Sequence, residues 1–161
     1  MGIAHWDEVE SYRRAKGEMD ATWQMLGEAA GTKDIGLNRV RVAPGKLPTP
    51  PHSHGASEEI FVMLEGDGTL HLWPSPLLVE RTGAAQKQIP IRAGHVIARP
   101  PGTRVSHWLR AGEDGLTMLV YGTRKPNDMC WYPRSSKIAW RGLGVIGRIE
   151  VLAYDDGEPD D

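Results

Sequence analysis

Two histidines and a glutamate follow one another closely in the segment 52–59. His52 and His54 are two positions apart, and because alternate side chains of a strand share a face, both imidazoles project the same way, roughly 6.5 Å apart along the backbone. Gly55 permits a turn that would carry Glu59 back beside the pair. Imidazole nitrogens and carboxylate oxygens bind divalent metals at about 2.0–2.2 Å. The segment therefore predicts three ligands of one metal ion rather than a polar strand end.

Alternation along the expected strand 59–65 separates two neighbouring glutamates. Glu59 shares a face with Phe61, whereas Glu58 shares the other face with Ile60. If Phe61 lines the interior of the fold, Glu59 points inward and Glu58 outward. Alternation alone leaves open which face is inside.

A fourth ligand is expected from a distant part of the chain. The residues Pro-Pro-Gly at 100–102 predict a tight corner, after which the chain returns as a strand that carries His107. The other reading of His107, a histidine packed between strands, remains open at this point.

These residues resemble the two sequence motifs of the cupin superfamily. The first motif is Gly-x5-His-x-His-x(3,4)-Glu-x6-Gly, and its fixed positions correspond to Gly45, His52, His54, Glu59 and Gly66. Six residues separate the first glycine from the first histidine, one more than usual.

The second cupin motif, Gly-x5-Pro-x-Gly-x2-His-x3-Asn, is met only in part. Gly94, Pro100 and Gly102 fit it, but His107 lies two residues late and Ala111 stands where asparagine is expected. A shift of two residues preserves the strand face. His107 is accordingly predicted to point inward with the other ligands.

The resemblance implies an all-β fold, a double-stranded β-helix or jelly-roll barrel. The chain is similar to small single-domain bacterial cupins of undefined role. It implies one divalent transition metal ion (Fe, Mn, Ni, Co, Cu or Zn) and a homodimer. The expected function is an enzyme acting on a small polar molecule, dioxygenase-like or an isomerase or lyase. A non-catalytic binding or sensing module that uses the same pocket is the alternative, and a structural dimer with a vestigial site is a third.

Three further residues are predicted to contact a substrate. Phe61 would line the barrel interior, Arg99 flanks the second motif and could pair with a carboxylate, and Trp108 could lie at the mouth of the pocket. The loop 132–137 carries two cations that could form an anion-binding nest, but we interpret it as a solvated loop. The Gly-x-Gly-x-x-Gly run at 142–147 lacks room for a following helical unit and is interpreted as a turn.

The elements expected around these residues are short strands with turn signals between them. Residues 1–34 are predicted to form an irregular extension with helical turns at 7–14, and residues 35–154 the barrel. Strands are expected at the ranges 35–42, 59–65, 69–73, 88–91, 96–98, 107–110, 116–121 and 146–154, with a turn at 66–68 and a polar loop at 122–137. Residues 155–161 form an acidic tail.

Composition and charge exclude several classes of partner. The 161 residues are 40% hydrophobic and 25% charged, with a net charge of −2, which is typical of one globular domain. A chain with this net charge lacks the excess of positive charge that indicates binding to a nucleic acid or an anionic membrane surface. The longest apolar run, 60–64, is too short to cross a bilayer. Cys130 is the single cysteine, which excludes an internal disulfide and favours the cytoplasm.

Overall fold

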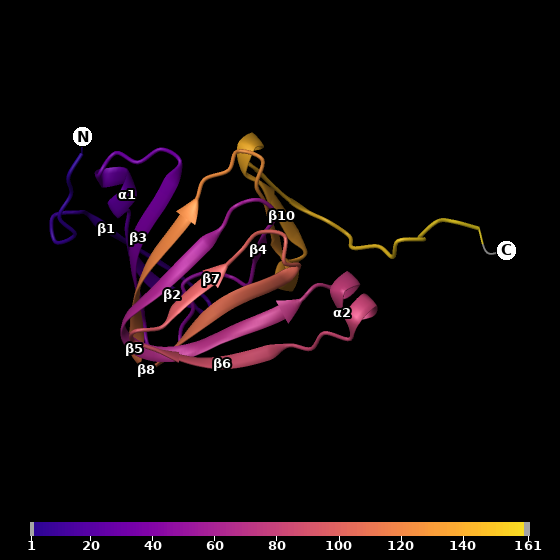
Figure 1. The fold of residues 1–161 in the computed structure, drawn as a ribbon, viewed down its shortest axis with the longest axis horizontal. Coiled ribbons are helices and arrows are strands. Elements are labelled where there is room, and N and C mark those ends of the chain that lie inside the picture. Colours follow the sequence, from indigo (N-terminus) through magenta and orange to yellow (C-terminus); the bar gives the residue numbers. More distant parts are fainter. Residues whose placement is uncertain (1, 160–161) are drawn as a thin grey trace.

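The computed structural model describes residues 2–159 and consists of two antiparallel β-sheets (Figure 1). The larger sheet has the strand order β1-β2-β3-β8-β5-β6, and β7 also pairs with β5. Its strands are β1 (Ser11–Lys16), β2 (Met19–Gln24), β3 (Ile35–Val42), β5 (Glu59–Pro74), β6 (Lys87–Arg92), β7 (Val96–Arg99) and β8 (Val105–Thr123). This architecture is the all-β cupin jelly roll that the motifs imply.

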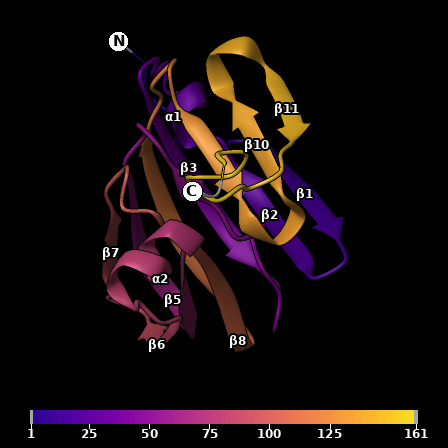
Figure 2. The same cartoon turned by 90° about the vertical axis from the view of Figure 1, so that its right-hand side faces the viewer.

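A smaller sheet lies across one face of the larger one (Figure 2). Its order is β11-β10-β9-β4, with β4 (Ser53–His54), β9 (Met129–Tyr132), β10 (Lys137–Trp140) and β11 (Val145–Arg148). Two short helices, α1 (Leu26–Ala29) and α2 (Pro76–Thr82), and 3-10 turns at Pro133–Ser135 and Arg141–Leu143 connect the strands. Within residues 2–159, no helix is long and apolar enough to span a bilayer.

The hydrophobic core covers the inner face of the larger sheet. Alternate residues of the central strands point into it, among them Val40 of β3, Met63 of β5, and Leu109 and Met118 of β8. Each of these side chains is almost completely removed from water. Burial of this apolar face is the main force that holds the long strands together.

The two central strands are longer than the sequence pattern predicts. The segment 66–68 was predicted to be a turn, but β5 continues through it with a shift in register against β8. Gly66 has φ of 76°, and a Cβ atom there would collide with the carbonyl group of Gly115. Gly66 therefore forms part of a β-bulge that bends one continuous strand. In a sequence, a glycine in a bulge cannot be distinguished from a glycine in a turn.

The N-terminal extension differs from its prediction. Residues 11–24 form the β1–β2 hairpin, which adds to the edge of the larger sheet beside β3, whereas helical turns were predicted at 7–14. All six residues of β1 are exposed. The strand therefore shows no alternation of apolar and polar residues in its sequence. Main-chain hydrogen bonds to β2 hold it in the sheet.

The C-terminal region also departs from its prediction. Strands β9 and β10 occupy part of the expected polar loop 122–137 and its continuation, while β11 ends at Arg148 instead of Tyr154. Beyond β11 the chain runs away from the two sheets (Figure 1). The acidic tail is exposed from 155 to 159, and its last two residues lie outside the described part of the chain.

Candidate metal centre

The two histidines of the first motif lie where the smaller sheet meets the larger one. His54 belongs to β4 and stands opposite Cys130 of β9. His52 precedes β4 and bonds to the backbone of β8: its N–H donates to the carbonyl of His107 (3.1 Å), and the N–H of His107 donates to the carbonyl of His52 (2.8 Å). Main-chain pairing therefore places residues that are far apart in the sequence next to each other.

Glu59 is the first residue of β5 and points to the same side as the three histidines. One of its oxygens, Oε2, lies 3.1 Å from Nε2 of His107, 3.5 Å from Nε2 of His54 and 3.6 Å from Nε2 of His52. Phe61, two residues on, is buried, whereas Glu58 is exposed, as strand alternation predicts. The four side chains are between 3 and 15% exposed, so little water competes for them.

The hydrogen bonds of the rings fix which nitrogen of His52 and His54 carries the proton. Nδ1 of His52 lies 2.9 Å from the carbonyl oxygen of Pro50, and Nδ1 of His54 lies 2.6 Å from Oδ2 of Asp128. Carbonyl and carboxylate oxygens only accept hydrogen bonds, so each Nδ1 is the donor. The lone pair of each ring is therefore on Nε2, which faces Glu59.

The donor atoms that surround this point lack other partners. Nε2 of His54, Nε2 of His107 and Oε2 of Glu59 are buried and make no hydrogen bond to any described residue. Unsatisfied buried polar atoms are rare in native proteins and call for an explanation. Three imidazoles and one carboxylate are a normal ligand set for a divalent transition metal, so the residues present fit such an ion.

The electrostatics favour the protonation states that metal binding requires at Glu59 and His107. Burial would lower the pKa of His54, but Glu59 and Asp128 raise it. Burial alone would raise the pKa of Glu59, but the three imidazoles beside its carboxylate, those of His107, His52 and His54, hold it well below its usual value. Burial lowers the pKa of His107 to about 4. At neutral pH the site thus holds an anionic carboxylate beside a neutral imidazole, and both have lone pairs to donate.

Asp128 is a site residue that the sequence analysis did not single out. It is completely buried, and Oδ1 accepts hydrogen bonds from the N–H groups of Ala56 (2.9 Å) and Ser57 (3.1 Å), while Oδ2 accepts from His54. These bonds outweigh the effect of burial and lower its pKa. It lies 74 residues from His54 in a polar segment, with no local signal to distinguish it from other loop acids.

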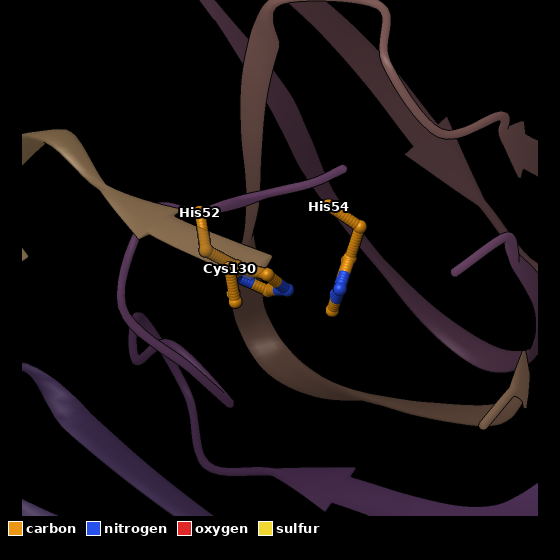
Figure 3. Close-up of side chains that lie close together, drawn as sticks. All are labelled: His52, His54 and Cys130. Atoms are coloured by element: carbon orange, nitrogen blue, oxygen red, sulfur yellow. The ribbon is translucent and has the colours of Figure 1, made fainter. Parts of the chain in front are cut away.

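Cys130 offers a second possible donor next to the histidines (Figure 3). Donor atoms of His52, His54 and Cys130 lie within 4.8 Å of one another, as do those of His52, Glu59 and His107. Burial raises the pKa of the Cys130 thiol to about 11. The carboxylate of Glu59 faces the Nε2 atoms of three histidines within 3.6 Å, so the set that includes Glu59 is the better metal site.

A cavity of about 320 Å³ opens onto the ligands. His52, His54, Glu59 and Phe61 line it, so Phe61 lies where a substrate contact is expected. The cavity wall does not include the other two predicted contacts. Trp108 follows His107 on the opposite face of β8 and stacks on His71, with ring centroids 4.6 Å apart.

Arg99, the remaining predicted contact, is tied to the backbone beside the second motif. Its guanidinium donates to the carbonyl of Val105 at 2.7 Å. Burial lowers the pKa of Arg99, while the charge of Glu59 opposes that shift. Arg99 does not line the cavity, but its positive charge acts on the carboxylate of Glu59.

Comparison with known proteins shows similarity only at the level of structure. No family model matches the chain, and no curated protein matches it by sequence. A protein from Acidithiobacillus ferrooxidans, named as a candidate sugar phosphate isomerase, is 26% identical with a TM-score of 0.73, over 91% of this chain and 92% of that one.

Two further solved structures show the same fold. A sugar phosphate isomerase of the cupin superfamily from Silicibacter pomeroyi is 23% identical with a TM-score of 0.72, over 99% of this chain and 96% of that chain. A candidate oxalate decarboxylase from Thermotoga maritima is 24% identical with a TM-score of 0.55, over 76% of this chain and 99% of that one.

Proposed function

Because this chain shares the fold of solved cupin-superfamily structures and carries residues that resemble the cupin motifs, we propose that it is a metal-dependent enzyme acting on a small polar molecule. The ligands are His52, His54, Glu59 and His107. The single observation that carries the proposal is the convergence of three imidazole nitrogens on Oε2 of Glu59 within 3.6 Å, with no hydrogen bond to satisfy most of these atoms. The ligand types suit Fe, Mn, Ni, Co, Cu or Zn and do not select among them.

The cavity provides a suitable place for a reaction. A bound ion would supply Lewis acidity to a substrate carbonyl or enol oxygen. Phe61, Met118 and Val120 make part of the wall apolar, which excludes water from the reacting atoms. Burial raises the pKa of Tyr132, which also lines the cavity, so its hydroxyl remains protonated and can donate a hydrogen bond to a substrate oxygen.

An isomerase is the form of this activity that we favour. The structure named as a candidate sugar phosphate isomerase aligns over nearly the whole of both chains. An oxygen-consuming enzyme, an oxidase or a dioxygenase, is the second candidate, because two oxalate oxidase structures, each 25% identical with TM-scores of 0.51 and 0.52, share the fold over about two thirds of this chain. A small-molecule binding module without turnover is the alternative to both.

The test begins with the metal content of the purified protein and of His54→Ala, with His5→Ala as a control because His5 is exposed and does not line the cavity. We expect about one ion per wild-type chain and per control chain, and loss of it in His54→Ala. Aldose–ketose interconversion, followed by NMR, identifies an isomerase, whereas oxygen uptake identifies an oxidase or a dioxygenase. Ligand binding without turnover identifies the binding module, and wild-type protein that takes up no divalent metal refutes the proposal.

A homodimer and a cytoplasmic location stay predictions. Light scattering of the purified protein tests the first, and cell fractionation tests the second.

A further inference from the structure

The rim of the cavity carries three positively charged side chains that the metal site does not use. Arg14 comes from β1, Lys137 from β10 and Arg141 from the turn after β10. Among the described residues, Glu59 is the only acidic side chain in the cavity wall. Because Glu59 would be neutralised by a bound ion, the outer part of the cavity has a net positive charge.

Two of these cations, Arg14 and Lys137, differ from other cations nearby in lacking acidic partners. The paired arginines and their carboxylates are Arg13 with Asp20, Arg110 and Arg134 with Glu18, and Arg124 with Glu28. In contrast, no described carboxylate lies within 4.0 Å of Arg14 or Lys137. Nε of Arg141 is 3.6 Å from Asp128, whose oxygens already accept three hydrogen bonds. The charges of Arg14 and Lys137 are therefore available to a ligand, whereas Arg141 shares its charge with Asp128.

The three cations line the same cavity as Tyr132, which lies beside a metal ligand. The ammonium of Lys137 lies 5.5 Å from the centroid of the Tyr132 ring. The same ring lies 6.0 Å from the ring of His52, measured between centroids. Tyr132 thus lies between the ammonium of Lys137 and the metal ligand His52, and Arg14 and Arg141 belong to the wall of the same cavity.

Another donor beside the rim also lacks a partner. Nε1 of Trp23, a residue of β2 that lines the cavity, is buried and makes no hydrogen bond to the described residues. A buried indole N–H normally has an acceptor. An anionic oxygen in the cavity would supply one, whereas a cation would leave this donor unsatisfied.

We propose that Arg14, Lys137 and Arg141 form a binding site for the anionic group of the substrate, a phosphate or a carboxylate, while the other end of the molecule reaches the metal ligands. This inference rests on the proposed function and specifies its substrate class. Guanidinium groups bind both anions through paired hydrogen bonds, and lysine adds a point charge. The site is built by the N-terminal hairpin and the C-terminal strands, which are parts of the chain outside the two cupin motifs.

The experiment compares three ligands of the same carbon skeleton by calorimetry: ribose 5-phosphate, ribonate and ribose. The test variant is Arg14→Gln/Lys137→Gln. The control, Arg13→Gln/Lys87→Gln, removes the same two kinds of charge from exposed residues that do not line the cavity. All three proteins are measured with and without metal, and their metal content is determined.

We expect the wild type to bind at least one of the two anions more tightly than ribose, and more weakly as salt is added. The test variant should lose about tenfold or more in affinity for that anion, as expected for the loss of hydrogen bonds to a charged group. The control should match the wild type. A preference for ribose 5-phosphate identifies a phosphate site, and a preference for ribonate a carboxylate site.

Two results would overturn the inference: equal affinity of test and control variants for the anions, or no preference of the wild type for an anion over ribose. Metal content separates these failures from failure of the proposed function. A wild type that binds metal but shows no effect of the rim variants refutes only the rim. A protein that binds no metal refutes the enzyme, while its anion affinity still reports on the rim.

Discussion

The substitution Asp128→Asn changes one oxygen of a buried carboxylate to an amide nitrogen, and its effect can be worked out from the hydrogen bonds. Oδ1 would still accept from the N–H groups of Ala56 and Ser57, which confines the new NH₂ group to the side of His54. An amide donor facing Nδ1 forces that nitrogen to become an acceptor. The proton of His54 then moves to Nε2, where it points at the metal position.

The magnitude follows from the role of Asp128 behind a ligand. Loss of such an outer partner typically weakens metal binding by about 10- to 100-fold, or about 1.4–2.7 kcal/mol. The free energy of unfolding should change far less, because the backbone hydrogen bonds survive. Asp128→Ala, in contrast, leaves those buried N–H groups unsatisfied, with a loss of about 1–3 kcal/mol of stability for each group.

The assay is a competition titration of Zn²⁺ or Mn²⁺ against a chromophoric chelator, with urea unfolding of the same samples. Asp114→Asn is the matched control, since Asp114 is an exposed aspartate that does not line the cavity. Unchanged metal affinity in a folded Asp128→Asn protein would refute the argument that this carboxylate sets the tautomer of His54.

Two further predictions concern the interior. Cys130 should resist iodoacetamide at pH 8 in the native protein and react after unfolding, because it is buried and its pKa is about 11; mass spectrometry measures this, and rapid native labelling would contradict it. Leu109→Ala should lower the free energy of unfolding by about 2–5 kcal/mol, because Leu109 is 1% exposed in the core. Urea denaturation, with exposed Leu143→Ala as control, tests the second, and equal losses in both variants would refute it.

The sequence identifies the parts of the site that are local. His52, His54 and Glu59 lie within eight positions, so strand and turn geometry suffices to bring them together. His107 was accessible only through its resemblance to a family motif, because no local rule pairs it with His52. Asp128 could not be found, since a β4–β9 pairing brings it beside His54 and nothing in its own segment indicates that pairing.

The fold shows the same division. The alternation of apolar and polar residues in β3 and the central strands indicates a half-buried sheet, because the face of a strand that packs into the core consists of apolar residues. Strand β1 is fully exposed and forms through main-chain hydrogen bonds to β2, which every sequence without proline offers, so its residues show no comparable apolar alternation. The bulge at Gly66 was read as a turn because both structures need a residue with positive φ.

The reciprocal backbone bonds between His52 and His107 have a consequence for how the protein acquires its ion. Strand pairing, and not coordination, sets the distance between these two ligands. Folding and metal loading can then be separate events, unlike in domains whose chain orders itself around zinc. After a chelator removes the ion, the protein would stay folded with the ligands in place to bind another ion. Exchange of one metal for another therefore requires no unfolding.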